Sequence, residues 1–270
     1  MSMPSSRPRF FVPTDTAGSA FSVGQELDLP PTEAHHAAHV LRLKTGAEID
    51  LFDGRGGSAS GRIVRAHHGE VTASIDEVRP AVERPLPRIH LAFAVPKGNR
   101  LDWLLEKASE LGVAVLQPVR FDRSVAGGDD LSAAKRDRWL GHCIAAAKQA
   151  CVDFLPEIEP PLPLDAYAAT LRSVIAIYGD LTPDTRPLAN VVRSLSSKTG
   201  RSLEAEGGQT LSQTIHIIVG PEGGLPDAER RTLAAAGALP VRLGPTTLRI
   251  ETAAVALVAA VVAVAETSVQ

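Results

Sequence analysis

The sequence is poor in the features that mark several large classes of protein. Two cysteines in 270 residues cannot build a disulfide framework or close a zinc site by themselves, so both thiols are expected to stay reduced. No basic and apolar leader opens the chain. The longest uncharged apolar run, residues 253–265, is shorter than the roughly 20 residues that span a bilayer. We therefore expect a cytoplasmic protein without a membrane segment.

An excess of positive charge is also missing. The formal net charge is −3, whereas a protein that holds nucleic acid by bulk charge alone would be basic. Any contact with nucleic acid must then rely on local clusters of Lys and Arg and on shape. The G-x-G-x-x-G and G-x-x-x-x-G-K-[ST] patterns do not occur, so neither a dinucleotide-binding fold nor a phosphate-cradling loop is indicated.

The N-terminal part shows short β-type runs separated by turn residues. Strands are expected at about 9–12, 48–53, 59–66 and 71–78, with one helix at about 32–43 and Thr32 as its N-cap. This combination is typical of a small barrel. The stretch 79–87 carries three prolines, which favours a linker. We expect domains at 1–80 and 88–270, joined by a linker at 81–87.

After the linker, strands and helices alternate, which predicts a mostly parallel sheet with helices on both faces. The expected strands are 89–95, 113–119, 174–178, 215–219 and 240–243. The expected helices are 99–111, 132–150, 164–172, 227–236 and a last one from about residue 250. The polar stretch 194–213 is rich in Ser and Gly and is expected to be mobile.

The strongest local signal is residues 217–227, IIVGPEGGLPD, in which a buried strand ends in a glycine-rich turn and a helix begins. Ligands of open parallel sheets bind beyond the carboxyl ends of strands, where glycines let the backbone approach closely. A plain strand-to-helix turn has the same pattern, so this segment alone leaves both interpretations open.

A second signal follows the next strand, in residues 243–253, LGPTTLRIETA. Glu251 in the first helical turn complements the positive end of the helix dipole, so capping explains it. Arg249 has no such explanation, because a cation is misplaced at a helix start unless an anion faces it.

These two segments resemble the bacterial 16S ribosomal RNA uracil-N3 methyltransferase family (RsmE) of the SPOUT superfamily. The resemblance covers nearly the whole chain in order. Further matching residues are Arg7, Arg9, Phe10, His36, Val40, Leu41, Arg42, Phe52, Asp53, Gly54, Lys97, Lys107, Glu110, Leu111, Gly112, Val113, Pro118, Arg123, Ser124, Trp139, Ala146, Ala147, Gln149, Pro156, Glu157 and Ile158. One segment departs from the family: after Ala147 it usually has Glu-Gln-Ser-Gly-Arg, whereas residues 148–153 here read KQACVD, so Val152 replaces an arginine.

The resemblance implies an α/β chain, α+β overall, with an N-terminal PUA-like β-barrel and a C-terminal SPOUT α/β domain tied in a deep trefoil knot. It also implies S-adenosyl-L-methionine as cofactor, 16S ribosomal RNA within the small ribosomal subunit as partner, and a homodimer packed across the knotted helices. The cofactor-binding residues that it implies are Val219, Gly220, Pro221, Gly223, Gly224, Leu243, Gly244, Leu248 and Thr252.

Methylation of uracil N3 needs either a base or a cation that stabilises the uracil anion, because the protonated nitrogen is a poor nucleophile. Arg249 is the expected cation, and Glu222 is a weaker candidate for a base or for orienting the uracil base. No metal is expected. Contacts with RNA phosphates are expected from Arg7, Arg9, Arg42, Lys44, Lys97 and Arg123.

Two other functions stay open from the sequence. A SPOUT methyltransferase acting on another RNA atom, such as a ribose 2′-hydroxyl, would share the cofactor loops. A noncatalytic RNA-binding or ribosome-assembly protein could keep the fold without the chemistry. Cofactor binding and the identity of the methylated atom separate these alternatives.

Overall fold

The structure, a computed structural model, describes residues 7–13, 21–67, 69–85, 87–124, 131–172, 174–182, 185–191 and 214–267. The chain forms two compact units. The N-terminal unit comprises Met1–Arg84 and Ile144–Leu155, and the C-terminal unit comprises Pro85–Cys143 and Pro156–Gln270. The first division lies within the proline-bearing stretch, but no pattern in the sequence indicated that a later segment joins the N-terminal unit.

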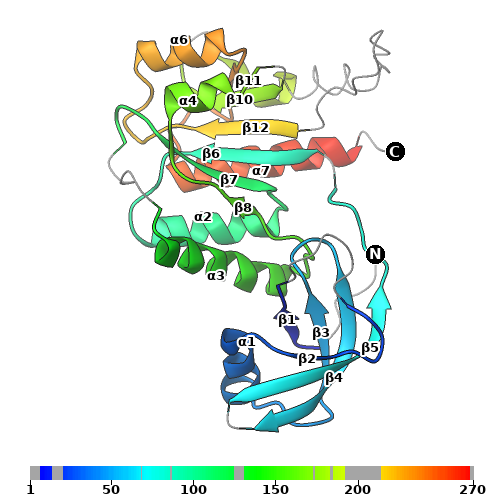
Figure 1. The fold of residues 1–270 in the computed structure, drawn as a ribbon. Coiled ribbons are helices and arrows are strands. Elements are labelled where there is room, and N and C mark those ends of the chain that lie inside the picture. Colours follow the sequence, from blue (N-terminus) through cyan, green and yellow to red (C-terminus); the bar gives the residue numbers. More distant parts are fainter. Residues whose placement is uncertain are drawn as a thin grey trace. The chain divides into compact units, whose positions relative to one another are not determined.

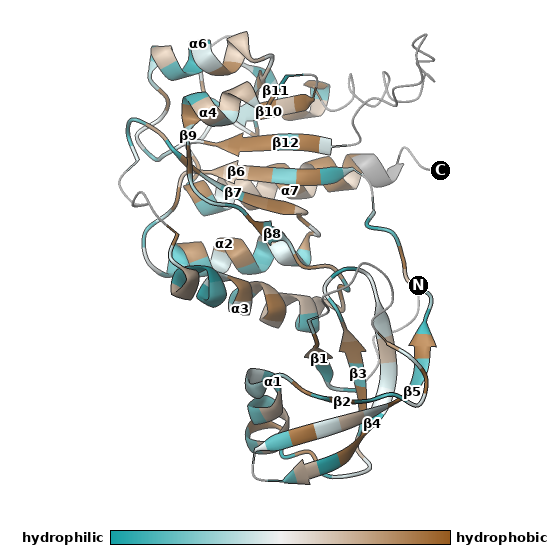
Figure 2. Cartoon of the chain, in the orientation of Figure 1, coloured by the Kyte–Doolittle hydropathy of each residue, from teal (hydrophilic) through white to brown (hydrophobic). Residues whose placement is uncertain are grey.

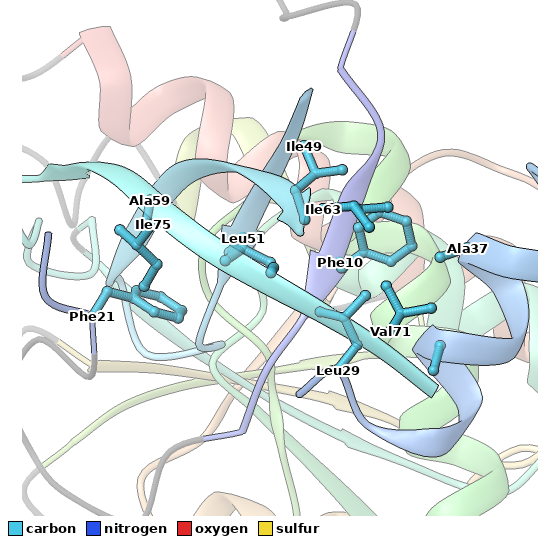
Figure 3. Packing of buried hydrophobic residues seen from close by; sticks show 12 residues of the cluster. Phe10, Phe21, Leu29, Ala37, Ile49, Leu51, Ala59, Ile63, Val71 and Ile75 are labelled. Atoms are coloured by element: carbon cyan, nitrogen blue, oxygen red, sulfur yellow. The ribbon is translucent and has the colours of Figure 1, made fainter. Parts of the chain in front are cut away.

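Five strands form the sheet of the N-terminal unit, in the order β1-β3-β4-β5-β2 (Figure 1). They are β1 (Arg9–Phe11), β2 (Glu26–Asp28), β3 (Glu48–Phe52), β4 (Ser58–His67) and β5 (Glu70–Arg79). β1 pairs with β3 in parallel, and the other neighbours are antiparallel. Phe10, Leu51 and Ile63 from three different strands meet in one hydrophobic core (Figure 3).

The helical segment of this unit begins earlier than expected. α1 (Pro31–His35) continues directly into a π-helical turn, η1 (His36–Val40), in which Leu41 N bonds His36 O at 2.9 Å. The expectation of Thr32 as N-cap is wrong, because Pro31 already occupies the first helical position. Proline suits that position, since its ring fixes a helical φ and its missing N–H would have no partner there.

Charged side chains anchor segment 144–155 inside the N-terminal unit. Arg9 forms an ion pair with Asp153 and lies 4.6 Å over the Phe52 ring, with only 7% of its side chain exposed. Lys148 Nζ lies 2.8 Å from Glu33 Oε2, and both side chains are largely buried. A buried charge that loses its partner is costly, so these two pairs make the segment an integral part of this unit.

The sheet of the C-terminal unit is parallel throughout, in the order β11-β13-β10-β12-β6-β7-β8, as expected from the alternation of elements. Its strands are β6 (Arg88–Phe93), β7 (Val115–Arg120), β8 (Glu157–Ile158), β10 (Ile175–Gly179), β11 (Arg186–Pro187), β12 (Thr214–Val219) and β13 (Leu239–Arg242). β9 (Leu162–Pro163) pairs with β7 outside this order. β12 is hydrophobic along most of its length, as strands covered on both faces are (Figure 2).

Two groups of helices accompany this sheet. α7 (Ile250–Thr267) packs against β6, β12 and α2 (Asn99–Glu110), while α6 (Asp227–Ala235) contacts β13 and α4 (Leu164–Ala169). α3 (Ala133–Ala150) extends from the C-terminal unit into the segment that belongs to the N-terminal unit. None of the described helices combines the length and apolar character that crossing a membrane requires.

The elements missed by the sequence are β2, β8, β9 and β11, each of two or three residues. A run that short contains no measurable periodicity. The expected mobile stretch 194–213 lies outside the described residues.

A polar cluster lies between β12 and α4 in the C-terminal unit. Burial lowers the pKa of His216 to about 4 and raises the pKa of Tyr167, so near neutral pH the imidazole is uncharged and the phenol keeps its proton. The Tyr167 hydroxyl and His216 Nδ1 share a hydrogen bond at 2.8 Å. His90, one strand away, packs against His216 with ring centroids 4.5 Å apart and planes tilted by 40°, and its pKa is also lowered by burial.

The depressed pKa of His216 makes folding sensitive to acid. Below its ordinary value of 6.5, the unfolded chain binds a proton at this site that the folded chain binds only near pH 4. The stability that this residue contributes is thus present above pH 6.5 and is lost as the pH falls through about 4. We expect His216→Asn to flatten the fall in unfolding free energy over this range, as measured by urea unfolding. Identical pH profiles for the two proteins would contradict this assignment.

Candidate active site

A cavity of about 410 Å³ opens in the C-terminal unit at the carboxyl ends of β10, β12 and β13. These strands are neighbours in a parallel sheet, so the turns that follow them meet at one edge, where ligands of such sheets bind. The volume lies within the roughly 300–1,000 Å³ typical of small-molecule sites. The lining residues are Gly179, Asp180, Leu181, Thr182, Val219, Gly220, Pro221, Glu222, Gly223, Gly224, Leu225, Arg230, Val241, Arg242, Leu243, Thr246, Thr247, Leu248, Ile250, Ala253 and Leu257.

The glycine-rich turn after β12 forms one wall of this cavity. Gly224 has a φ of +71° and its N–H bonds Pro221 O at 2.9 Å, a left-handed turn that glycine adopts without strain. A side chain at Gly220 would place its Cβ 2.7 Å from Leu225 Cδ2, and Leu225 is itself buried. The two glycines are thus required for different reasons, one for conformation and one for space.

The turn after β13 forms another wall and leads into α7. Leu243 and Leu248 line the cavity, and 39% of Leu243 is exposed at its mouth. Ala253 N bonds Arg249 O at 2.8 Å, so the first helical turn of α7 starts at Arg249. Ile250 and Ala253 of that turn complete the wall.

The turn after β10 was not expected to belong to the site. Asp180 Oδ2 accepts a hydrogen bond from Arg230 Nε at 3.1 Å, and Leu181 N bonds its other oxygen at 2.9 Å. The hydrogen bond to Asp180 raises the pKa of Arg230. The sequence did contain a signal, since Gly179-Asp180 directly follows an expected strand, just as Gly220 follows β12.

A smaller recess adjoins the cavity at the carboxyl end of β6. It is lined by Ala94, Val95, Pro96, Lys97, Arg100, Ser124, Pro221, Glu222 and Ile250. Pro221, Glu222 and Ile250 line both spaces, so the recess and the cavity share a wall. In that wall, the Glu222 carboxylate forms an ion pair with the guanidinium of Arg100.

A loop after β7 supports the glycine-rich turn from outside. Arg123 Nη1 donates to Gly223 O at 2.7 Å, and Asp122 N donates to Glu229 Oε1 at 2.7 Å. Glu229 belongs to α6 and is buried, and its burial raises its pKa. Arg123, expected to contact RNA, is exposed but already holds a carbonyl of the turn.

Most of the residues that the sequence assigned to the cofactor come together. Val219, Gly220, Pro221, Gly223, Gly224, Leu243 and Leu248 line the cavity. Gly244 and Thr252 belong to the same turn and helix but do not line it. Of the two expected catalytic residues, Glu222 lines both spaces, whereas Arg249 is exposed and lines neither.

The basic residues expected to contact RNA differ in the exposure of their side chains and in the partners that those side chains already have. Arg7 Nη2 lies 2.9 Å from Glu48 Oε2, and Lys97 lines the small recess. Arg42 and Lys44 are exposed, and neither side chain has a hydrogen bond or ion pair among the residues that the structure describes. Arg9 needs correction, because its buried guanidinium is committed to Asp153 and cannot reach a phosphate.

Comparison with known proteins agrees with this arrangement. Residues 82–262 match the RNA methyltransferase domain family and residues 29–76 match the RNA methyltransferase PUA domain family. Ribosomal RNA small subunit methyltransferase E of Mycobacterium tuberculosis is 30% identical over 230 residues, covering 85% of this chain and 83% of the relative. The enzyme of that name from Bacillus subtilis is 27% identical over 237 residues, covering 85% of this chain and 89% of the relative.

Solved structures resemble the whole chain. Ribosomal RNA small subunit methyltransferase E from Neisseria gonorrhoeae, bound to S-adenosyl methionine, superposes with a TM-score of 0.74 at 29% identity, covering 94% of this chain and 96% of that one. A Legionella pneumophila protein in complex with the cofactor SAM reaches a TM-score of 0.80 at 28% identity, covering 96% and 98%.

The contrast between Arg9 and Arg42 predicts opposite effects on stability. Arg9→Ala leaves Asp153 without its partner, and we expect a loss of about 3 kcal/mol, the lower end for a broken buried ion pair because Asp153 is partly exposed. Arg42→Ala removes an exposed side chain and should change stability by less than about 0.5 kcal/mol. Urea unfolding of both variants measures this; equal losses would contradict the difference.

Proposed function

Since the chain belongs to the RNA methyltransferase family, and within it to the ribosomal RNA small subunit methyltransferase E group, we propose that it methylates N3 of a uridine in 16S ribosomal RNA. The cofactor is S-adenosylmethionine and the substrate is the small ribosomal subunit, in the cytoplasm. The observation that carries the proposal is the cavity between the glycine-rich turn and the start of α7, in a chain that matches these enzymes over most of its length.

The cavity fits the proposed cofactor. Leu181, Leu243 and Leu248 offer apolar surface for an adenine ring, and the backbone of the glycine-rich turn lies open beside them. At Gly224 no described atom lies within 4 Å of where a Cβ would stand, so this part of the wall faces empty space. When bound, S-adenosylmethionine supplies a methyl group on a positively charged sulfonium.

The chain's own contribution is to hold the acceptor in line with that methyl group. Positioning reacting atoms about 3–3.5 Å apart provides much of the rate of such a transfer. A uridine paired in RNA must leave its helix to reach the edge of the cofactor cavity. Glu222 remains a candidate base, and the exposed Arg249 at the start of α7 is available for an RNA phosphate.

The decisive experiment is mass spectrometry of nucleosides from 16S ribosomal RNA of cells with and without the gene. We expect N3-methyluridine to disappear in its absence and to return when purified protein and S-adenosylmethionine are added to the undermethylated small subunits. Loss of a 2′-O-methylated nucleoside would instead indicate another methylated atom. Unchanged nucleosides together with RNA binding would indicate a noncatalytic protein.

A side chain added to the glycine-rich turn should weaken cofactor binding, because it would occupy space that the cofactor needs. We expect Gly224→Val to weaken S-adenosylmethionine binding at least tenfold, about 1.4 kcal/mol, as measured by calorimetry. Gly237→Val is a matched control: Gly237 also has positive φ, +87°, with no described atom near its Cβ position, but lies at the end of α6 outside the cavity. Equal affinities for both variants would remove the turn from the binding site.

We propose that Arg42 and Lys44 contact RNA phosphates, because their side chains are exposed and unpaired among the described residues. Arg42→Ala should then weaken binding to small subunits and reduce the salt slope of log K by roughly one unit, leaving cofactor affinity unchanged. An unaltered salt slope would count against the contact.

We also propose a homodimer built on the C-terminal unit, with the knotted arrangement of its last strands and helix that the family implies. α7 is uncharged from Thr252 to Ala265, and Val255, Ala259 and Val262 remain only half-buried within one chain. Such an apolar remainder favours a self-complementary contact. Light scattering should report a dimer at micromolar concentration, and a monomer would contradict this.

A further inference from the structure

The small recess beside the cofactor cavity has room for about one water, at about 10 Å³, so an acceptor base would lie over its exposed rim and not inside it. The recess shares the Pro221–Glu222 wall and Ile250 with the cavity, so a base over this rim is adjacent to a molecule in the cavity. Its far side is formed by the segment after β6, with Pro96 and Lys97, and by the first turn of α2. Two cationic side chains, Lys97 and Arg100, therefore face this space together with one carboxylate, Glu222.

Arg100 is held in this recess from two sides. Its Nε donates to Lys97 O at 3.3 Å, and its Nη1 donates to Glu222 Oε1. About a third of the Arg100 side chain and about half of the Glu222 side chain remain exposed, at 32% and 46%. Both groups are thus fixed in direction by their mutual contact but still accessible to a third molecule. Arg249, the cation expected from the sequence, lines neither space.

The ionisation of uracil requires a proton acceptor and a cation, and the Glu222–Arg100 pair offers both. When N3 loses its proton, the negative charge spreads over O2 and O4, and a cation beside either oxygen stabilises the anion. A guanidinium that is already paired with a carboxylate has little charge to offer until that carboxylate is neutralised. A proton moving from N3 to Glu222 does both at once, since it generates the anion and frees the charge of Arg100.

Building on the proposed function, we infer that Glu222 accepts the N3 proton of the target uracil and that Arg100 is the cation that binds the resulting uracil oxygen anion. The N3 electron pair then forms the new bond to the methyl carbon, and the carbon–sulfur bond breaks with its electron pair left on sulfur. Products are N3-methyluracil, the neutral thioether of the spent donor and protonated Glu222. Its exposed carboxyl returns the proton to solvent, and the ion pair with Arg100 re-forms.

The test is single-turnover methylation of small ribosomal subunits from cells lacking the gene, at saturating enzyme and S-adenosylmethionine and over a range of pH. Arg100→Gln should slow the reaction at neutral pH by about 100- to 1,000-fold, the usual loss for one oxyanion-stabilising group. The deficit should shrink as the pH rises, because uracil then ionises without help. Glu222→Gln should give a rate that keeps rising with pH where the wild type has levelled off.

Control variants distinguish a chemical role of Arg100 from a structural role in supporting the glycine-rich turn. Arg138→Gln removes an arginine from another pair with a carboxylate in the same unit, Arg138–Asp102 at 2.8 Å, outside both spaces, and should leave the rate unchanged. Arg100→Lys retains the charge and should recover part of the rate. Calorimetry should give unchanged S-adenosylmethionine affinity for Arg100→Gln.

The outcomes are distinct. N3-methyluridine from the wild type with full single-turnover rate in Arg100→Gln would overturn this inference and leave the proposed function intact. A rate deficit that is independent of pH, or one matched by an equal loss of cofactor affinity, would show that Arg100 only supports the turn. Absence of N3-methyluridine with the wild-type protein would overturn the proposed function and this inference together.

Discussion

In the C-terminal unit, the chemical groups are gathered by the parallel pairing of strands. β12 pairs with β6 on one side and β10 on the other, in a register that aligns Ile217 with Leu91 and with Ile177. Parallel strands in register end together, so the residues that follow them must share one edge of the sheet. The glycine-rich turn, the Asp180 turn and the recess with Arg100 are neighbours for this reason, although they are far apart in the sequence. Changes inside these strands would shift the whole site.

The sequence predicted the long elements and the residues that occur in continuous segments. Periodicity identifies α2 or β12 because each repeats its pattern several times, and the two loop motifs named most of the cavity wall. β8 and β11 have two residues each and repeat nothing. We expected a domain boundary at the proline-bearing stretch. The return of residues 144–155 to the N-terminal unit was not expected, since no local pattern indicates which unit a helix end joins.

The sequence could not predict which side chains would pair, for a related reason. Arg100 and Glu222 are 122 residues apart, and Arg9 and Asp153 are 144 apart. An arginine looks the same in a sequence whether it will be buried against a carboxylate or left in solvent. Arg9 was therefore assigned to RNA and Arg100 was overlooked. The segment that departs from the family has a structural role. Lys148 pairs with Glu33, and Asp153 pairs with Arg9.

The composition of the N-terminal unit from two separated segments has a consequence for synthesis. A chain emerges from the ribosome in order, and domains generally fold as they emerge. Until residue 153 is available, Arg9 has no carboxylate, and until residue 148 is available, Glu33 has no ammonium partner. The N-terminal unit therefore cannot complete its core from its first 84 residues. Arg9 and Glu33 stay without their partners while the early strands and helices of the C-terminal unit are synthesised. A protein expressed as residues 1–84 would remain in that unfinished state.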